Sequence, residues 1–210
     1  MKYLIAASLV ILVLNASLAQ TKLGIKLTSS IITQRISHSN DSIGIGKGSN
    51  AFVPSVALFA DFPVSKNYFF SSGIGYISKR VNLTVSEPGD HNSQSKSYNI
   101  QYVQLPVTLK LYTNEIALDK KLYFQFGPVF DIAVHTKENN PDYSVIKEFQ
   151  PIDITLLFGA GLEIQLAPNT AMHLGLNYSR GLVNIVSKSD VDGDLVIKND
   201  LYGIDIAIKF

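Results

Sequence analysis

The sequence predicts an all-β fold, an eight-stranded antiparallel up-and-down transmembrane β-barrel. Three observations predict it. Apolar residues alternate with small or polar residues at a period of two in eight separate segments. The connections between these segments alternate between long and short. The chain has 210 residues, 46% of them hydrophobic, and no long apolar run after its first residues, so any entry into a membrane has to be made by strands.

The first residues have the pattern of a secretory signal peptide. Lys2 provides the basic start, an apolar run extends from Tyr3 to Leu14, and small residues stand at Ser17 and Ala19. The alternative is a membrane anchor, but the apolar run is short for a span. We therefore expect a signal peptide at 1–19, cleaved before Gln20, and an outer-membrane β-barrel domain at 20–210.

Composition excludes several classes of partner and anchor. The formal net charge is +1, so the chain has no electrostatic preference for nucleic acid. Cysteine is absent, which excludes disulfides and also a lipid attached to a cysteine at the cleavage site. An exported chain of this kind is either soluble outside the cytoplasm or inserted as strands.

The expected strands follow one another along the mature chain. They cover 21–36, 50–62, 67–85, 97–112, 121–135, 153–166, 170–186 and 201–210. The apolar side carries, in that order of strands, Leu23, Ile25, Leu27 and Ile31; Phe52, Val56, Leu58 and Phe62; Tyr68, Phe70, Ile74 and Tyr76; Val103, Leu105, Val107, Leu109 and Leu111; Leu122, Phe124, Phe126, Phe130 and Ile132; Ile154, Leu156, Phe158, Leu162 and Ile164; Met172, Leu174, Leu176 and Tyr178; Tyr202, Ile204, Ile206, Ile208 and Phe210. Strict alternation gives each strand two faces of different polarity.

Loop lengths indicate which ends of the strands lie together. The polar connections at 37–49, 86–96, 137–149 and 187–199 are long, whereas those at 61–67, 113–121 and 167–170 are shorter. In an up-and-down sheet all the long ones then fall at one end. Short periplasmic turns and long extracellular loops are typical of bacterial outer-membrane barrels.

The polarity of the two faces predicts which one is the interior. The mixed face is rich in glycine and polar residues and carries Lys26, Lys110, Lys209, Asp131, Glu163 and Asp205. In water the apolar face would be an abnormally large exposed patch, whereas in a membrane it is the lipid contact. We therefore expect most of the six charges to form a salt-bridged plug inside the barrel. Glycines at 73, 75, 127, 159, 161, 175 and 203 would leave room there for Tyr102 and Tyr123.

Aromatic residues near strand ends predict girdles at the two membrane interfaces. They are Tyr68, Phe70, Tyr112, Tyr123, Tyr178, Tyr202 and Phe210. The general preference of aromatic residues for strands accounts for part of this distribution.

A soluble fold with the opposite orientation is the main alternative. A lipocalin-like barrel in the periplasm or outside the cell would turn the large apolar residues inward to bind an apolar ligand. The two folds differ in the direction of residues such as Phe158 and Ile204.

Several strings resemble the PorT-like outer-membrane β-barrel family of Bacteroidota. They are YVQLPVTLKLY at 102–112, FGPVF at 126–130, LLFGAGLEIQL at 156–166 and LNYSRGLVNI at 176–185. The resemblance covers the mature chain and implies an eight-stranded barrel in the outer membrane of a Gram-negative bacterium. It also implies that the final aromatic strand, ending at Phe210, is recognised by the barrel-insertion machinery. One branch of the family belongs to a secretion and gliding apparatus, but no residue of this chain selects that branch.

Motifs with recognisable chemistry are weak. SDVDGDL places Asp190, Asp192 and Asp194 at the spacing of calcium ligands, but Leu195 and Leu201 stand where a calcium-binding loop needs Gly and Glu. GIGKG at 44–48 lacks the spacing of a phosphate-binding loop and is expected to be a mobile loop.

The four histidines share no short metal-binding motif. His38, His91 and His135 stand in or beside the long loops, and His173 is expected inside the barrel near the other end. His135, Asp142 and Asp153 could meet at the rim as an enzyme site, although no spacing requires it. We expect no catalytic, cofactor-binding or metal-binding residues, and no enzyme activity.

These patterns predict an integral outer-membrane protein with a filled interior. Eight strands leave little lumen, so a structural or interaction role through the long loops is expected rather than a general pore. The expected partners are outer-membrane lipid, the barrel-insertion machinery and an unknown extracellular or periplasmic protein, with no nucleic acid.

Overall fold

The computed structural model describes residues 21–38, 44–86, 94–138, 145–190 and 194–210. The expected signal peptide at 1–19, His91 and Asp142 lie outside these residues. No helix in the described ranges is long and apolar enough to cross a membrane.

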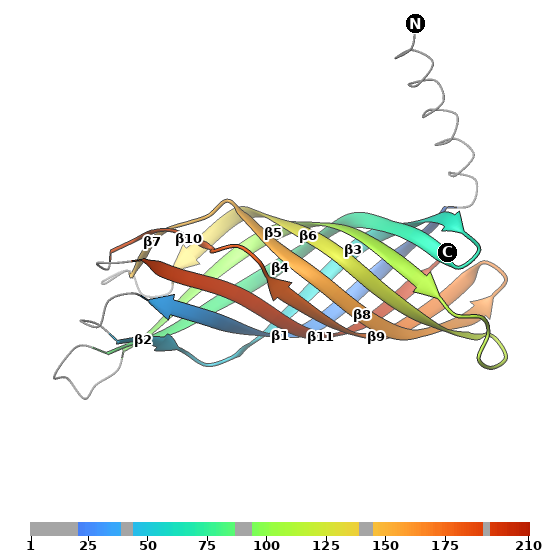
Figure 1. Cartoon of the computed structure of the whole chain (residues 1–210), viewed down its shortest axis with the longest axis horizontal. Coiled ribbons are helices and arrows are strands. Elements are labelled where there is room, and N and C mark those ends of the chain that lie inside the picture. The colour runs from blue at the N-terminus through green and yellow to red at the C-terminus, as the bar shows by residue number, and fades with distance from the viewer. Residues whose placement is uncertain (1–20, 39–43, 87–93, 139–144, 191–193) are drawn as a thin grey trace, which may run out of the picture.

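Eight long antiparallel strands form a closed barrel (Figure 1). They are β1 (Lys22–His38), β3 (Ala51–Ser65), β4 (Tyr68–Ser86), β5 (Gln94–Tyr112), β6 (Lys120–Glu138), β8 (Ile152–Ala167), β9 (Thr170–Gly181) and β11 (Leu195–Lys209). Neighbours in sequence are neighbours in the barrel, β11 pairs with β1, and β4 pairs with β5 to complete the ring. The predicted up-and-down barrel is therefore confirmed.

Three short strands add to the end of the barrel that carries the long connections. β2 (Gly44–Lys47) pairs with β4, and β7 (Ile146–Phe149) pairs with β10 (Val186–Ser189) in a separate two-stranded ribbon. The expectation of a mobile loop at GIGKG is wrong, because Ile45 and Lys47 continue the sheet opposite Val85 and Leu83. This segment forms a strand because it pairs with the projecting end of β4, and a glycine-rich sequence does not predict such pairing.

Two strand boundaries differ from the sequence prediction. β9 ends at Gly181 rather than near 186, and β11 begins at Leu195 rather than 201. Leu195 pairs with His38 and Ile197 with Ile36, so β11 is as long as its neighbour β1 requires. Strand length was thus set by the partner strand.

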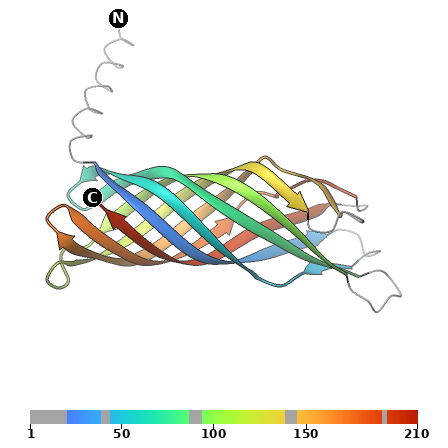
Figure 2. The same ribbon diagram turned by 180° about the vertical axis from the view of Figure 1, so that it is seen from behind.

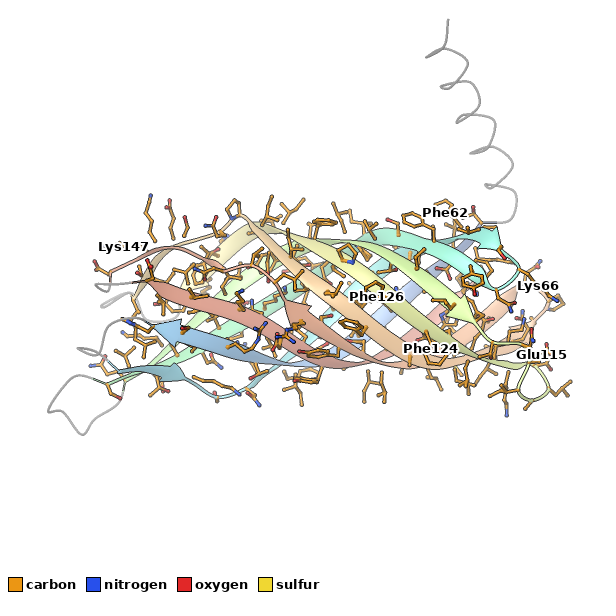
Figure 3. All side chains as sticks on the ribbon, in the orientation of Figure 1. Phe62, Lys66, Glu115, Phe124, Phe126 and Lys147 are labelled. Atoms are coloured by element: carbon orange, nitrogen blue, oxygen red, sulfur yellow. The ribbon has the colours of Figure 1, made fainter. Side chains whose placement is uncertain are left out.

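The described chain begins and ends at the same end of the barrel (Figures 1 and 2). β1 and β11 run antiparallel there, with Gly24 opposite Lys209. Lys66 and Glu115, in two of the short turns, mark this end, and Lys147 of the ribbon marks the opposite end (Figure 3). We call the part of the barrel nearer Lys66 the turn half and the part nearer Lys147 the loop half.

The direction of the side chains in the turn half confirms the predicted orientation. Ile204 and Ile206 are 58% and 51% exposed, whereas Asp205 between them is 6% exposed. Phe124 and Phe126 are likewise exposed on the outer surface (Figure 3). Phe158 is also exposed, at 44%. The lipocalin alternative requires the opposite orientation and is contradicted.

Polarity reverses between the two halves of the barrel. On β4 the inward residues change from Ser71 and Gly75 to Val81 and Leu83, which are fully buried. The outward residues of the same strand change from Ile74 and Tyr76 to Arg80, Asn82 and Thr84. The outer surface is therefore apolar in the turn half and polar in the loop half, and the interior has the reverse arrangement.

Candidate functional site: the filled barrel interior

A layer of ion pairs closes the interior of the turn half. Lys110 of β5 contacts Asp61 of β3, with the Lys110 Nζ to Asp61 Oδ1 distance at 2.8 Å, and the Ser71 hydroxyl donates to the same oxygen at 2.6 Å. Lys209 of β11 pairs with Glu163 of β8, and the Nε2 atom of His173 lies 2.8 Å from Glu163 Oε2. Charged groups in this layer are thus paired rather than free to bind a solute.

Aromatic rings pack around these ion pairs. Tyr123 and His173 have ring centroids 5.0 Å apart, and Tyr112 stacks edge-on against Phe69 at 5.3 Å. A Cβ at Gly161 would lie 2.7 Å from Cε1 of Tyr123, so this glycine leaves the space that the ring occupies. Tyr102 and Tyr123 are buried inside, as predicted.

A second ion-pair layer lies where the two halves meet. Lys79 of β4 contacts Asp131 of β6 at 2.6 Å and Asp153 of β8 at 2.8 Å. All three side chains are at most 1% exposed. Gln104 donates to Asp131 at 2.8 Å, and Asn199 donates to Asp153 at 3.4 Å. One lysine therefore links three strands of the wall through two carboxylates.

Between the two layers lies a polar cavity of about 60 Å³. Lys26, Thr28, Gln104, Asn177 and Asp205 are among its lining residues. This volume has room for a few water molecules and for no larger solute.

The loop half is closed by an apolar core. It includes Ile32, Val53, Val81, Leu83, Ile100 and Ile197, all at most 1% exposed. The β7–β10 ribbon adds Ile146 and Val186 to this core, and the residues that directly precede its two strands add Val145 and Ile185. The Tyr98 hydroxyl accepts hydrogen bonds from the backbone nitrogens of Val145 and Ile146, at 3.1 and 3.3 Å. The ribbon is thereby fixed over the interior.

At the other end, the described part of the barrel opens into a basin. This basin has a volume of about 720 Å³ and is lined by Lys22, Lys66, Phe69, Pro168 and Lys209, among others. Its floor includes Glu163, which belongs to the first ion-pair layer. The basin therefore does not continue as a channel through the barrel.

Four of the six predicted interior charges form ion pairs. Lys110, Lys209, Asp131 and Glu163 do so. Asp205 instead accepts a hydrogen bond from Thr28 at 2.5 Å, and Lys26 lines the cavity without an ion pair to any described residue. The prediction that most of the charges are paired is thus confirmed.

Sequence reasoning missed two central residues of the network, Lys79 and Asp61. Asp61 lies within the second expected strand, at 50–62, but was not among the six predicted interior charges. Lys79 shares its face with Ile77 and Val81, which have the polarity expected of the outside. The alternation of Arg80, Asn82 and Thr84 with Val81 and Leu83 is the signal that would have placed Lys79 inside.

The proposed enzyme site at the rim is not assembled. Asp153 is fully buried inside the barrel and bound to Lys79. His135 is exposed on the outside, opposite Gln101 of β5. His173 lies inside the turn half, as predicted, and contacts Glu163.

The SDVDGDL motif at 189–195, considered above for calcium binding, contributes an ion pair to the ribbon. Asp190 forms an ion pair with Lys147 across the β7–β10 ribbon, and Asp192 lies outside the described residues. Within the described ranges no group of three or more His, Cys, Asp or Glu residues could hold a metal ion.

The aromatic girdle prediction is partly wrong. Tyr68, Tyr202 and Phe210 are exposed, and the Tyr178 and Tyr202 rings stack with centroids 4.9 Å apart. Tyr112 and Tyr123, however, are 8% and 4% exposed and face the interior. Position near a strand end does not determine the face, which depends on the parity of the residue along the strand.

A closed eight-stranded barrel with an apolar outer band and a polar, filled interior defines an integral outer-membrane β-barrel protein. Residues 18–187 match the family model of the outer membrane protein beta-barrel domain, and the chain belongs to that family. The protein is thus located in the outer membrane, in contact with its lipid.

Solved structures of outer-membrane barrels share the fold. OprG from Pseudomonas aeruginosa has 12% identity and a TM-score of 0.53, with 90% of this chain and 95% of that chain covered. Neisserial surface protein A has 11% identity and a TM-score of 0.50, with coverages of 89% and 95%. AlkL, determined in lipid bilayers, has 10% identity and a TM-score of 0.51, with coverages of 90% and 89%. No curated protein sequence matches the chain significantly.

Proposed function

We propose that this protein is a sealed outer-membrane barrel that acts as a structural or interaction protein through its loop half, and that it conducts no solutes. The observation that supports this most strongly is the continuous filling of the interior. Two ion-pair layers, a cavity of about 60 Å³ and an apolar core follow one another along the axis. A pore requires a continuous polar passage, and none of these layers provides one.

The direction of insertion follows from loop length. Bacterial barrels place short turns in the periplasm and longer loops outside, so the loop half faces the exterior. The ribbon then offers exposed side chains, including Lys147 and Lys188, to a partner protein. Because their ion pairs with Asp190 and Glu148 are more than half exposed, they hold the ribbon only weakly and stay accessible.

The finer assignments belong to the same proposal. The resemblance to PorT-like barrels supports an origin in Bacteroidota, and the basic and apolar pattern of 1–19 supports a cleaved signal peptide. The alternating final strand, with Phe210 exposed beside the short turns, supports recognition by the barrel-insertion machinery. Asp153, one of the three residues considered for a rim site, is instead bound to Lys79 inside the barrel, which supports a role without catalysis.

Conductance tests the sealed barrel. We expect the purified protein, reconstituted into a planar phospholipid bilayer, to produce no stable current steps in 1 M KCl. The double variant Val81→Gly/Leu83→Gly removes apolar filling from the loop half only and is expected to stay closed, since both ion-pair layers remain. Stable ohmic steps in the wild type would contradict the proposal.

Crosslinking in cells tests the interaction role. A photo-reactive residue is placed at Lys147 or Lys188 on the ribbon, and at Lys66 in a short turn as the matched control. We expect a discrete adduct from the ribbon positions that is absent from the control position. An identical adduct pattern at all three positions would refute a role specific to the loop half.

A further inference from the structure

The lipid-facing wall holds a cluster of cations that no interior or loop contact explains. Arg35 of β1 lies directly opposite Lys198 of β11, and Arg180 of β9 lies opposite Asp200 of β11. All four residues are on the outer face, where the apolar band gives way to the polar surface of the loop half. Like charges directly opposite each other in a sheet are unfavourable unless an anion lies between them.

The one carboxylate of this cluster is already fully used. Asp200 accepts hydrogen bonds from Arg35 at 2.8 and 3.1 Å and from the Gly181 backbone nitrogen at 3.1 Å. The only other carboxylate on β1, β9 and β11 is Asp205, which lies inside the barrel. Arg180 and Lys198 have no ion pair with any described residue, so the cluster carries an excess of two positive charges.

An apolar groove leads along the wall to these cations. Its upper part, of about 490 Å³, is lined by Phe126, Phe158, Ala160, Leu176 and Tyr178, among others. Its lower part, of about 630 Å³, shares Phe124, Ala160 and Leu176 and extends to Leu162 and Leu174. The small side chain of Ala160, beside Gly159 and Gly161, forms the notch between bulky neighbours.

The groove and the cations are in line. Tyr178 pairs with Phe158 and Arg180 with Leu156 in successive outward positions of β9 and β8. The Cα atoms of Tyr178 and Arg180 are therefore about 7 Å apart along the strand, from the rise per residue. Such a site combines an open apolar groove on the outer wall with a cationic head site where the apolar band ends.

We propose that this wall binds a phosphorylated lipid of the outer leaflet, with an acyl chain in the groove centred on Ala160 and a phosphate between Arg180 and Lys198. Guanidinium and ammonium groups are the usual protein partners of phosphate, and the apolar groove distinguishes a lipid from an acidic protein. The proposal rests on the outer-membrane location and on the proposed direction of insertion, which puts the loop half outside, and it is independent of the sealed interior and of any protein partner.

Titration of the folded full-length protein in maltoside micelles with diphosphoryl lipid A, followed by native mass spectrometry, tests this site. The double variant Arg180→Gln/Lys198→Gln is expected to bind about 25-fold more weakly, from about fivefold for each cation near a lipid surface. The matched control, Lys66→Gln/Lys120→Gln, removes two exposed cations at the opposite end and is expected to bind as the wild type does.

The apolar part of the site is tested separately. Ala160→Leu fills the notch and is expected to weaken binding, whereas Ala60→Leu, on the outer face of β3, is expected to leave it unchanged. Inorganic phosphate at 10 mM should not displace the lipid, because it gains nothing from the groove.

Wild-type affinity in the Arg180→Gln/Lys198→Gln variant would overturn the proposal, as would an equal loss in Lys66→Gln/Lys120→Gln. Displacement of the lipid by 10 mM phosphate would also overturn it, by showing a general anion site. Each variant is first checked for the heat-dependent gel mobility of a folded barrel, so loss of fold is not read as loss of binding.

Discussion

The turn half and the loop half of the barrel use the same strands with opposite polarity. On β11, Ile204 and Ile206 face outward and Asp205 faces inward. Earlier on the same strand, in the loop half, Lys198 faces outward and Ile197 faces inward. In the turn half the outside is hydrocarbon, so polar groups gather in the interior and neutralise one another. In the loop half the outside is water and lipid headgroups, so the interior is an apolar core like that of a soluble protein. The medium around each half thus decides what fills it.

The largest expected effect comes from breaking the ion-pair layer at the junction of the halves. Lys79→Met leaves Asp131 and Asp153 buried and facing each other without a cation. We expect the free energy of unfolding to fall by about 3–5 kcal/mol. Urea unfolding of the protein in phospholipid vesicles measures it.

Two further variants make this test specific. Lys66→Met, in an exposed turn, should leave the free energy of unfolding unchanged. The triple variant Lys79→Met/Asp131→Asn/Asp153→Asn removes the charges together and should recover most of the loss. A change below about 1 kcal/mol for Lys79→Met would show that the layer contributes little.

A matched pair of truncations sharpens the comparison between the halves. Leu83→Ala, in the core of the loop half, is expected to lower the free energy of unfolding by about 2–5 kcal/mol, because a fully buried side chain leaves a cavity. Leu58→Ala, on the lipid face of the turn half, should cost much less, since lipid chains fill the space. Equal losses in the same vesicle assay would mean that the interior of the loop half is not packed as a core.

A pair of added charges probes the outer surfaces. Leu176→Arg places a cation in the apolar band, where Leu176 is 67% exposed, and is expected to cost about 2–4 kcal/mol. Ser95→Arg, on the outer face of the loop half, is expected to cost about 0–1 kcal/mol. Vesicle unfolding of both proteins measures the difference, and a costly Ser95→Arg would place the membrane higher on the barrel than the polarity reversal does.

Much of the turn half could be predicted from sequence because its signal is periodic and local. The alternation around Phe158 and Glu163, and around Ile204 and Asp205, predicts that these segments are strands, which residues share a face, and whether that face meets lipid or the interior. The interior position of Lys110 and Lys209 follows from parity alone. Their ion-pair partners, Asp61 and Glu163, were harder to predict from the sequence, because the order and stagger of distant strands decide which charges meet.

The loop half was harder to predict from the sequence, because the prediction assigned one polarity to each face along the whole length of a strand. Lys79 was missed for this reason. The ribbon of β7 and β10 and the extension by β2 depend on pairing between segments that are short and weakly patterned. Short strands are stabilised by their partners rather than by their own sequence.

The sequence by itself determined that the chain forms strands and that there are eight long ones, and it predicted that the apolar face contacts lipid, because alternation and loop length are properties of neighbouring residues. Only the tertiary structure decided which charges meet, where the polarity reverses, and how Arg180 and Lys198 come to stand above the groove at Ala160. Those relations join residues far apart in sequence, and closure of the barrel with a fixed stagger is what brings them together.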